Sequence, residues 1–197
     1  GLGLLNSVDR YDRIENEYYD NNLEENSSRA FELSQIKEIP NKKEQTIPYR
    51  HLVTLSQSKD SIEEIEKTLM RTGDINKLNK SEKMKLKSKL KCIEGWITNH
   101  APESVKFEIQ MNPPSIDFSE DDLNTIGELK KQIESITWSP EKIHDSFYEL
   151  QEKYNTPAKE YFRIMYLTIL GKERGPRLGF FLATIEQKFV VERLNSY

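Results

Sequence analysis

PAKEYFRIMYLTILGKERGPRLGFFL, residues 157–182, is the most informative stretch of this sequence, because it encodes two helices and the corner between them. Pro157 suits the first turn of a helix, where its missing N–H would have no partner, and Gly171 suits the left-handed residue that often ends one. Between them, apolar residues recur at helical spacing: Tyr161, Phe162, Met165, Leu167 and Leu170. Pro176 opens a further helix, so the stretch predicts two helices joined by a short loop.

Helix signals continue on both sides of this stretch. Ser119, followed by acidic residues, can cap one helix, and Ser139 with Pro140 can open another. The first of these helices bears Leu123, Ile126, Leu129 and Ile133, and the second bears Ile143, Phe147, Leu150 and Tyr154. The helix that opens at Pro176 is expected to run to Asn195, with a break near Glu186. These signals together predict a helical bundle from about residue 115.

The amino-terminal part carries weaker but similar signals. Apolar residues spaced by three or four predict an amphipathic helix from residue 4 to about 19. After a polar break, apolar residues near 29–37 predict a short strand: Ala30, Phe31, Leu33 and Ile36. Pro48 can open a helix over residues 49–57. Asp60 or Ser61 can cap the next helix, which Gly73 ends.

Lysine alternates with other residues from Lys83 to Lys91, a pattern that alone would suit a basic-faced strand. The continuation favours a helix over residues 81–99, because apolar residues recur at helical spacing: Leu86, Leu90, Ile93, Trp96 and Ile97. Pro102 ends it. Residues 105–110 alternate and Pro113-Pro114 follows, which predicts an extended connector. We therefore expect a predominantly all-α chain divided into residues 1–112 and 113–197.

Composition restricts the function classes. The 197 residues carry a net charge of −4, which argues against a general, charge-driven nucleic-acid binder, so any RNA contact must be local. No apolar run reaches the roughly 18 residues that span a membrane, and no signal-peptide pattern is present. The sequence predicts a cytoplasmic protein. Its start at Gly1-Leu2-Gly3, directly before a helical pattern, suggests a piece of a longer protein.

Catalytic and metal-binding patterns are missing from the sequence. Cys92 is the single cysteine, which excludes an internal disulfide and a Cys-based zinc site, and we expect it to be a buried thiol on a helix. His51, His100 and His144 stand far apart, without carboxylates at metal-ligand spacing. There is no phosphate-binding loop and no Gly-x-Ser-x-Gly, so we nominate no catalytic residue, metal ligand or cofactor site.

The first candidate binding segment is residues 47–57, where Arg50 and His51 lie in the first turn of a predicted helix. Unpaired backbone N–H groups and the positive end of the helix dipole favour phosphate there. Arg50 or His51 could therefore contact an RNA phosphate or base edge. The alternative is that Tyr49 and His51 only pack between helices.

The second candidate is the corner itself, which holds Lys172, Arg174 and Arg177 next to Phe180 and Phe181. From residue 157 onward seven cations face four glutamates: Lys159, Arg163, Lys172, Arg174, Arg177, Lys188 and Arg193 against Glu160, Glu173, Glu186 and Glu192. Single-stranded RNA loops bind by stacking on aromatic or guanidinium planes while cations meet the phosphates. The alternative is a tight turn with both phenylalanines in the core and the cations solvated.

At these two segments the sequence resembles the class I lysyl-tRNA synthetases. The resemblance lies in Tyr49-Arg50-His51-Leu52 and in Leu170-Gly171-Lys172-Glu173-Arg174-Gly175-Pro176-Arg177-Leu178-Gly179. It extends to Gly3-Leu4-Leu5-Asn6, to Tyr11-Asp12-Arg13-Ile14-Glu15, and to Phe189-Val190-Val191-Glu192-Arg193-Leu194. The motifs keep the family's order and span most of the chain, and the run at 170–182 is the most specific.

The resemblance implies the carboxy-terminal anticodon-binding region of such an enzyme, a helical cage attached to a Rossmann-fold catalytic domain. Residues 1–112 would then be the stem-contact and first cage part, and residues 113–197 the anticodon-binding bundle. The parent enzyme would activate lysine with ATP and transfer it to its tRNA. The family's His-Ile-Gly-His and Lys-Met-Ser-Lys-Ser signatures are absent. The second signature has only a superficial, chance match here, in Lys83-Met84-Lys85-Leu86-Lys87-Ser88. We expect the chain alone to be inactive in aminoacylation.

We therefore expect a monomer that binds lysine tRNA, but neither DNA nor membranes. The expected contacts are made by Lys172, Arg174 and Arg177, with Arg50 and His51 as secondary ones. Two alternatives stay open at this point. One is the anticodon domain of a glutamate-type class I synthetase, since the cage is shared; the other is a helical protein-interaction module without RNA binding.

Overall fold

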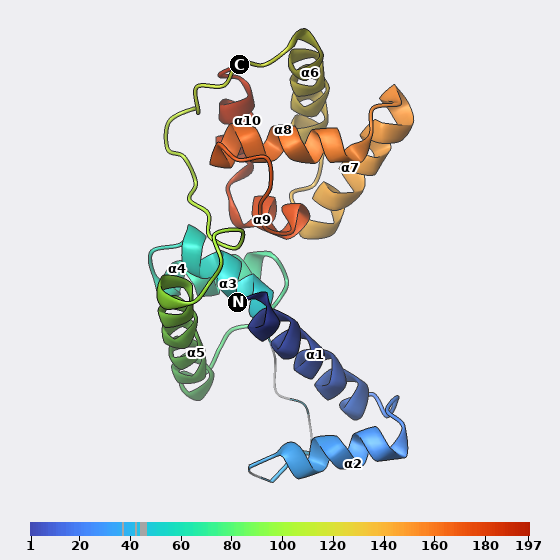
Figure 1. The fold of residues 1–197 in the computed structure, drawn as a ribbon, viewed down its shortest axis with the longest axis vertical. Coiled ribbons are helices and arrows are strands. Elements are labelled where there is room, and N and C mark those ends of the chain that lie inside the picture. Colours follow the sequence, from blue (N-terminus) through green and yellow to red (C-terminus); the bar gives the residue numbers. More distant parts are fainter. Residues whose placement is uncertain (37, 42, 44–46) are drawn as a thin grey trace.

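A computed structural model describes residues 1–36, 38–41, 43 and 47–197. Within this part of the chain every regular element is an α-helix, which confirms the predominantly all-α prediction. The helices are α1 (Leu2–Tyr19), α2 (Glu25–Ser34), α3 (Tyr49–Ser58), α4 (Ile62–Arg71), α5 (Lys80–Asn99), α6 (Glu120–Ser135), α7 (Pro140–Tyr154), α8 (Ala158–Leu170), α9 (Leu178–Thr184) and α10 (Gln187–Leu194). They form an elongated molecule, with α6 to α10 at one end, α3 to α5 in the middle, and α1 leading to α2 at the other end (Figure 1).

Local capping chemistry explains where several helices begin and end. The Ser119 hydroxyl accepts the Asp122 backbone N–H at 3.2 Å while the Asp122 carboxylate accepts the Ser119 N–H at 3.1 Å, a reciprocal capping box. Ser61, rather than Asp60, caps α4, and Ser139 caps α7 with Pro140 in its first turn. Gly171 ends α8 with φ of +66°, the left-handed conformation that glycine adopts most easily. These predicted caps are confirmed.

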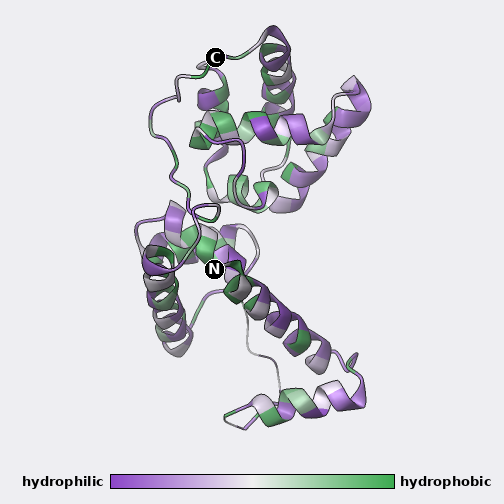
Figure 2. Ribbon diagram, in the orientation of Figure 1, coloured by the Kyte–Doolittle hydropathy of each residue, from purple (hydrophilic) through white to green (hydrophobic). Residues whose placement is uncertain are grey.

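The carboxy-terminal helices enclose the larger of two hydrophobic cores. Its fully buried members come from α6 to α10 and include Leu129, Phe147, Tyr161, Met165 and Phe181. Figure 2 shows green hydrophobic residues interspersed with purple hydrophilic ones along these helices. The contact of α9 with α7 is unusually close, because a Cβ built on Gly179 would lie 2.6 Å from the Pro140 carbonyl oxygen. Only glycine fits there without movement.

A second core lies under α1, α3, α4 and α5. It is built from buried residues such as Leu52 and Leu55 of α3, Leu69 of α4 and Ile93 of α5. One member, Phe180, comes from α9 and therefore from the other end of the chain. The two cores thus meet where α9 reaches α3.

The segment between α5 and α6 runs along both cores without forming a helix over residues 106–119, as its alternation and Pro113-Pro114 predict. Arg193 of α10 is only 4% exposed and fixes this segment by donating to the Met111 carbonyl at 3.1 Å and to the Gln110 carbonyl. It also donates to Thr168 of α8 at 2.7 Å. Burial lowers the pKa of the Arg193 guanidinium. A boundary at residue 112 stays a prediction.

The strand predicted near residues 29–37 is wrong, since α2 occupies Glu25–Ser34; residue 37 lies outside the described residues. Phe31 is buried against the Tyr11 and Tyr18 rings of α1, with centroids 5.8 and 4.6 Å away. Leu33 is 70% and Ile36 100% exposed, so the apolar residues do not share one sheet face. Phe31 is thus the one buried aromatic residue of this short run. Such a burial pattern fits a helix that packs on another helix.

Two smaller expectations also need correction. Cys92 lies on the exposed side of α5 rather than in the core, because the apolar stripe of that helix is formed by Leu86, Leu90, Ile93 and Trp96. The helix expected to open at Pro176 begins at Leu178 instead, after Arg177 as N-cap. The expected break near residue 186 is confirmed, since α9 ends at Thr184 and α10 begins at Gln187.

Candidate functional site

The fold brings the two candidate segments together. His51 of α3 and Phe180 of α9 stack with ring centroids 3.6 Å apart and an interplanar angle of 8°. The corner loop, residues 171–177 between α8 and α9, therefore lies beside the amino-terminal end of α3. The sequence identified both segments separately, but no local pattern indicated that they touch.

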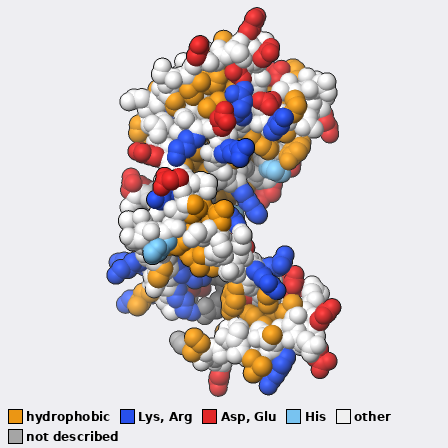
Figure 3. All heavy atoms as spheres, viewed as in Figure 1, with side chains coloured by type: hydrophobic (Ala, Val, Ile, Leu, Met, Phe, Trp, Pro, Cys, Tyr) orange, Lys and Arg blue, Asp and Glu red, His pale blue; other side chains and the backbone are white. Residues whose placement is uncertain are grey.

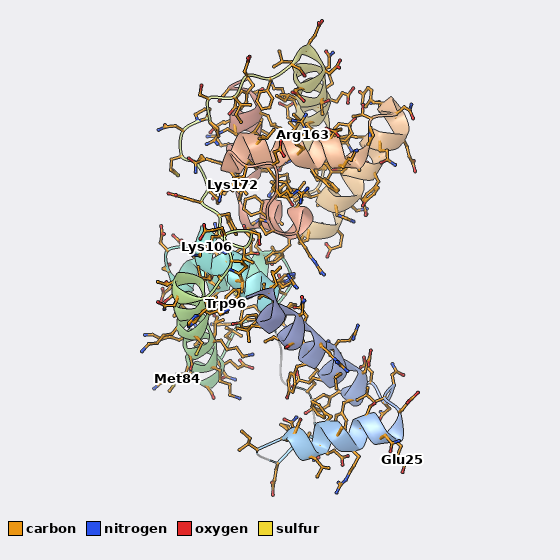
Figure 4. The ribbon with its side chains drawn as sticks, in the orientation of Figure 1. Glu25, Met84, Trp96, Lys106, Arg163 and Lys172 are labelled. Carbon is orange, nitrogen blue, oxygen red and sulfur yellow. The ribbon has the colours of Figure 1, made fainter. Side chains whose placement is uncertain are left out.

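The cations of the corner loop are exposed. Lys172, Arg174 and Arg177 are all exposed, and Lys172 donates to the Lys106 carbonyl oxygen at 3.2 Å. Figure 4 shows Lys172 and Lys106 at the junction between the upper and middle helices. Within the described part of the chain, neither Arg174 nor Arg177 has a hydrogen-bond or ion-pair partner. Both guanidinium groups can therefore meet an anionic ligand without first breaking an internal contact.

The corner loop is held in one conformation by Tyr166 of α8. The Tyr166 hydroxyl donates to the Pro176 carbonyl, and burial raises the pKa of that hydroxyl to about 12. A Cβ built on Gly175 would lie 2.7 Å from a Tyr166 ring carbon, so the loop passes directly over the ring. This contact supports the loop that carries the cations, which reduces the entropy lost when they bind a ligand.

Two of the hollows that border the corner loop in the described structure are lined by several cations. The larger, of about 670 Å³, is lined by Glu103, Ser104, Val105, Lys106, Phe107, Lys172, Glu173, Arg174 and Gly175. The second, of about 300 Å³, is lined by Asp9, Asp12, Arg13, Asn16, Lys43, Pro48, Arg50, His51 and Arg177. Figure 3 shows Lys and Arg side chains on both sides of the indentation between the upper helices and α1. Cations from distant parts of the sequence are thus gathered around one corner.

Arg50 lines this second hollow, but its guanidinium already binds two residues of α1. Its Nε forms an ion pair with the Asp9 carboxylate and its Nη2 donates to Asn6 Oδ1 at 3.0 Å. The Tyr49 backbone N–H at the start of α3 donates to Asp12 Oδ2 at 3.4 Å. Burial raises the pKa of Asp12, and this hydrogen bond opposes the rise. Two of the groups predicted to bind an anion at the start of α3, the Tyr49 N–H and the Arg50 guanidinium, therefore already contact carboxylates of α1.

His51 packs between helices, as the alternative interpretation of its segment holds. One face of the ring stacks on Phe180, and Nδ1 lies 3.0 Å from Asp74 Oδ1 at 22% side-chain exposure. Phe180 and Phe181 are buried, which confirms the core alternative for both. The RNA contacts assigned to Lys172, Arg174, Arg177, Arg50 and His51 stay predictions.

Several residues at the corner were not candidates from the sequence. Lys106 and Phe107 belong to the connector, and Asp9, Arg13 and Lys43 belong to the first helix and a loop. Each is an ordinary exposed or alternating residue in its own segment. Only the packing of the connector and α1 against the corner reveals them.

Metal and membrane sites are not indicated in the described ranges. No three His, Cys, Asp or Glu side chains there converge as ligands for a metal ion. None of the described helices combines the length and the apolar character needed to cross a bilayer.

The fold and the corner define an all-α protein with a local cationic site on a chain whose net charge is −4. No family model matches the sequence. Lysine–tRNA ligases do match it: that of Thermoplasma acidophilum is 31% identical over 198 residues, covering 100% of this chain and 38% of the relative. The enzyme of Pyrococcus horikoshii is 33% identical over 205 residues, with 99% and 38% covered. For Thermococcus kodakarensis the identity is 32% over 204 residues, with 99% and 39% covered.

Along its whole length the chain is homologous to one region of the lysine–tRNA ligases. It spans about 38% of the length of these relatives.

Proposed function

We propose that this chain is the region of a class I lysine–tRNA ligase that binds the anticodon stem and loop of lysine tRNA. The observation that carries the proposal is the corner loop, where exposed Arg174 and Arg177 have no internal partner among the described residues and Tyr166 supports the loop. The names of the homologues, all lysine–tRNA ligases, favour lysine over the glutamate-type alternative.

The corner offers two kinds of contact. A guanidinium can pair with a phosphate in a bidentate manner or stack on an unpaired base, so Arg174 and Arg177 suit a loop whose bases are splayed out. Lys172 adds a third positive charge beside them. Arg50 can bind a phosphate only if the phosphate replaces Asp9 as the ion-pair partner of its guanidinium. His51 contributes by stacking on Phe180, which positions this ring next to the corner loop.

Catalysis would reside elsewhere in the intact enzyme. Activation of lysine with ATP and its transfer to tRNA would be performed by residues that this chain does not contain, and the chain itself would bind no cofactor. We also propose that it is cytoplasmic, monomeric and without affinity for DNA. Its role would be to place the acceptor end of the tRNA at that distant catalytic site.

The test is binding of labelled lysine tRNA to the 197-residue chain at several salt concentrations. The variant Arg174→Ala with Arg177→Ala should bind about tenfold more weakly, and the slope of log affinity against log salt should fall by about two, because two phosphate contacts are lost. A matched variant, Lys153→Ala with Lys188→Ala, removes the same charge from exposed positions of α7 and α10 and should change neither quantity.

A transcript with substituted anticodon bases should bind more weakly than lysine tRNA. If the unaltered chain binds neither transcript at low salt, the protein-interaction alternative is correct instead. If glutamate tRNA binds more tightly than lysine tRNA, the glutamate-type alternative is correct.

A further inference from the structure

Helix α5 carries the most concentrated positive charge of the chain. Residues 80–91 contain six lysines and one glutamate, a net charge of +5 within a chain of net charge −4. The glutamate, Glu82, is occupied in the capping box with Asn79, whose backbone N–H it accepts at 2.8 Å. The corner loop uses none of these lysines, so they require a separate explanation.

The lysines divide between two faces of the helix. Lys85 lines a hollow with residues of α1 and α2, and Lys89 lies near enough to Asp12 to oppose the rise in its pKa. Lys80, Lys87 and Lys91 follow the seven- and four-residue spacing of a single helical face. All three are exposed and, among the residues that the structure describes, have no hydrogen-bond or ion-pair partner.

Lys83 extends this face toward α4, where its Nζ pairs with Glu66 at 2.7 Å. From Lys80 to Lys91 the face is about 16 Å long, at 1.5 Å of rise per residue. The opposite face of α5 is buried in the core through Leu86, Leu90 and Ile93, against α3. The lysine face is therefore held rigidly on the same core that supports the start of α3 and the corner.

We propose that the face formed by Lys80, Lys87 and Lys91 is a second RNA-binding surface that contacts the phosphate backbone of the double-stranded part of the tRNA. This proposal rests on the proposed function. The chemistry of the face differs from that of the corner: it contains no arginine and no exposed aromatic ring, so it has no planar group on which a base could stack. Lysine ammonium groups act as mobile point charges, which suits a backbone contacted without regard to sequence.

A membrane surface fits this face less well. Helices that bind lipid headgroups present a broad apolar face with aromatic residues beside the lysines. On α5 the apolar face is buried, and Met84, at 67% exposure, is its single large exposed apolar residue. Met84 lies at the outer, lower end of α5 (Figure 4). RNA is therefore the partner that the charge and the missing apolar anchor favour.

The experiment compares three variants of the 197-residue chain. The face variant is Lys80→Gln with Lys87→Gln and Lys91→Gln, which keeps helix propensity while removing three charges. Its control is Lys131→Gln with Lys153→Gln and Lys188→Gln, exposed positions on α6, α7 and α10. The third is the corner variant Arg174→Ala with Arg177→Ala. Circular dichroism and thermal melting establish that each variant folds.

Two labelled probes distinguish the surfaces: whole lysine tRNA, and a single-stranded oligonucleotide with the sequence of its anticodon loop. We expect the face variant to bind whole tRNA about tenfold more weakly, with a salt slope reduced by two to three, while its affinity for the oligonucleotide stays unchanged. The corner variant should lose affinity for both probes, and the control for neither.

The inference is overturned if the unaltered chain binds tRNA and the face variant binds it as the control does. It is also overturned if the face variant loses the oligonucleotide to the same extent as tRNA, or if the face mediates binding to phosphatidylserine vesicles rather than to RNA. If the unaltered chain binds neither probe, the proposed function fails and this inference fails with it.

Discussion

His51 and Phe180 stack face to face across the boundary between the two cores, with ring centroids 3.6 Å apart. Phe180 is 6% exposed and belongs to the amino-terminal core although its helix, α9, packs mainly on α7. The pair therefore fixes the position of the corner cations relative to α3.

The pair should show measurable energetic coupling. Phe180→Ala should lower the free energy of unfolding by about 3 kcal/mol, since it empties a buried site. In a double-mutant cycle with His51→Ala, measured by urea denaturation, the coupling should be about 1 kcal/mol. Substituting exposed His100 in place of His51 should give additive effects. Additivity for His51 itself would show that the stacking contributes nothing to stability.

The ion pair between Arg50 and Asp9 should limit RNA binding. Asp9→Asn removes a carboxylate from the hollow that Arg177 shares and releases the Arg50 guanidinium, so affinity for lysine tRNA should rise about threefold. Asp20→Asn removes the same charge at an exposed position beyond the end of α1 and should leave affinity nearly unchanged. A decrease with Asp9→Asn would mean that Asp9 orients Arg50 for binding rather than competing for it.

The close contact between α9 and α7 should make Gly179 irreplaceable. The Cβ of Gly179→Ala would lie 2.6 Å from the Pro140 carbonyl oxygen, so this variant should lose about 1 to 3 kcal/mol of unfolding free energy. Gly127, in the interior of α6, has no atom within 4 Å of its built Cβ. Gly127→Ala should therefore stabilise the chain by about 0.5 to 1 kcal/mol. Thermal melting of both variants measures these two effects. Equal changes in stability for Gly179→Ala and Gly127→Ala would contradict the prediction.

Stability below pH 4 should depend on Asp122. Its partial burial raises the pKa, but hydrogen bonds from Ser119 and Arg163 lower it more, so the net pKa lies below the ordinary 3.8. A carboxyl with a lowered folded-state pKa contributes stability above its unfolded pKa and loses it as pH falls through the folded value. Asp122→Asn should therefore flatten the decline of unfolding free energy below about pH 4.

Exposed Asp121, next to Asp122 in the same helical turn, provides the control. Urea denaturation at pH 6, 4 and 3 should give Asp121→Asn the same decline as the unaltered chain. If Asp122→Asn also declines in parallel with the unaltered chain, Asp122 does not contribute to acid sensitivity.

Much of the secondary structure could be predicted because its causes are local. The caps at Ser119, Ser139 and Gly171 depend on residues within one helical turn, and the inward faces of α6 and α7 repeat at helical spacing. The strand predicted near residue 31 was wrong because the cause of the helix there is not local. Helix α2 packs through Phe31 on aromatic rings of α1, and no pattern within ten residues indicates that contact.

Local sequence patterns were enough to predict a predominantly all-α chain, the loop that presents Lys172, Arg174 and Arg177, and a resemblance to one enzyme family. The position of this loop against α3, the packing of His51 on Phe180 and the ion pair of Asp9 with Arg50 could be seen only in the folded molecule. It also separated the lysines of α5 into an outward face and a face toward α1. The reason is physical: caps and periodicity act within a few residues, whereas these contacts join segments that only the burial of two cores brings together.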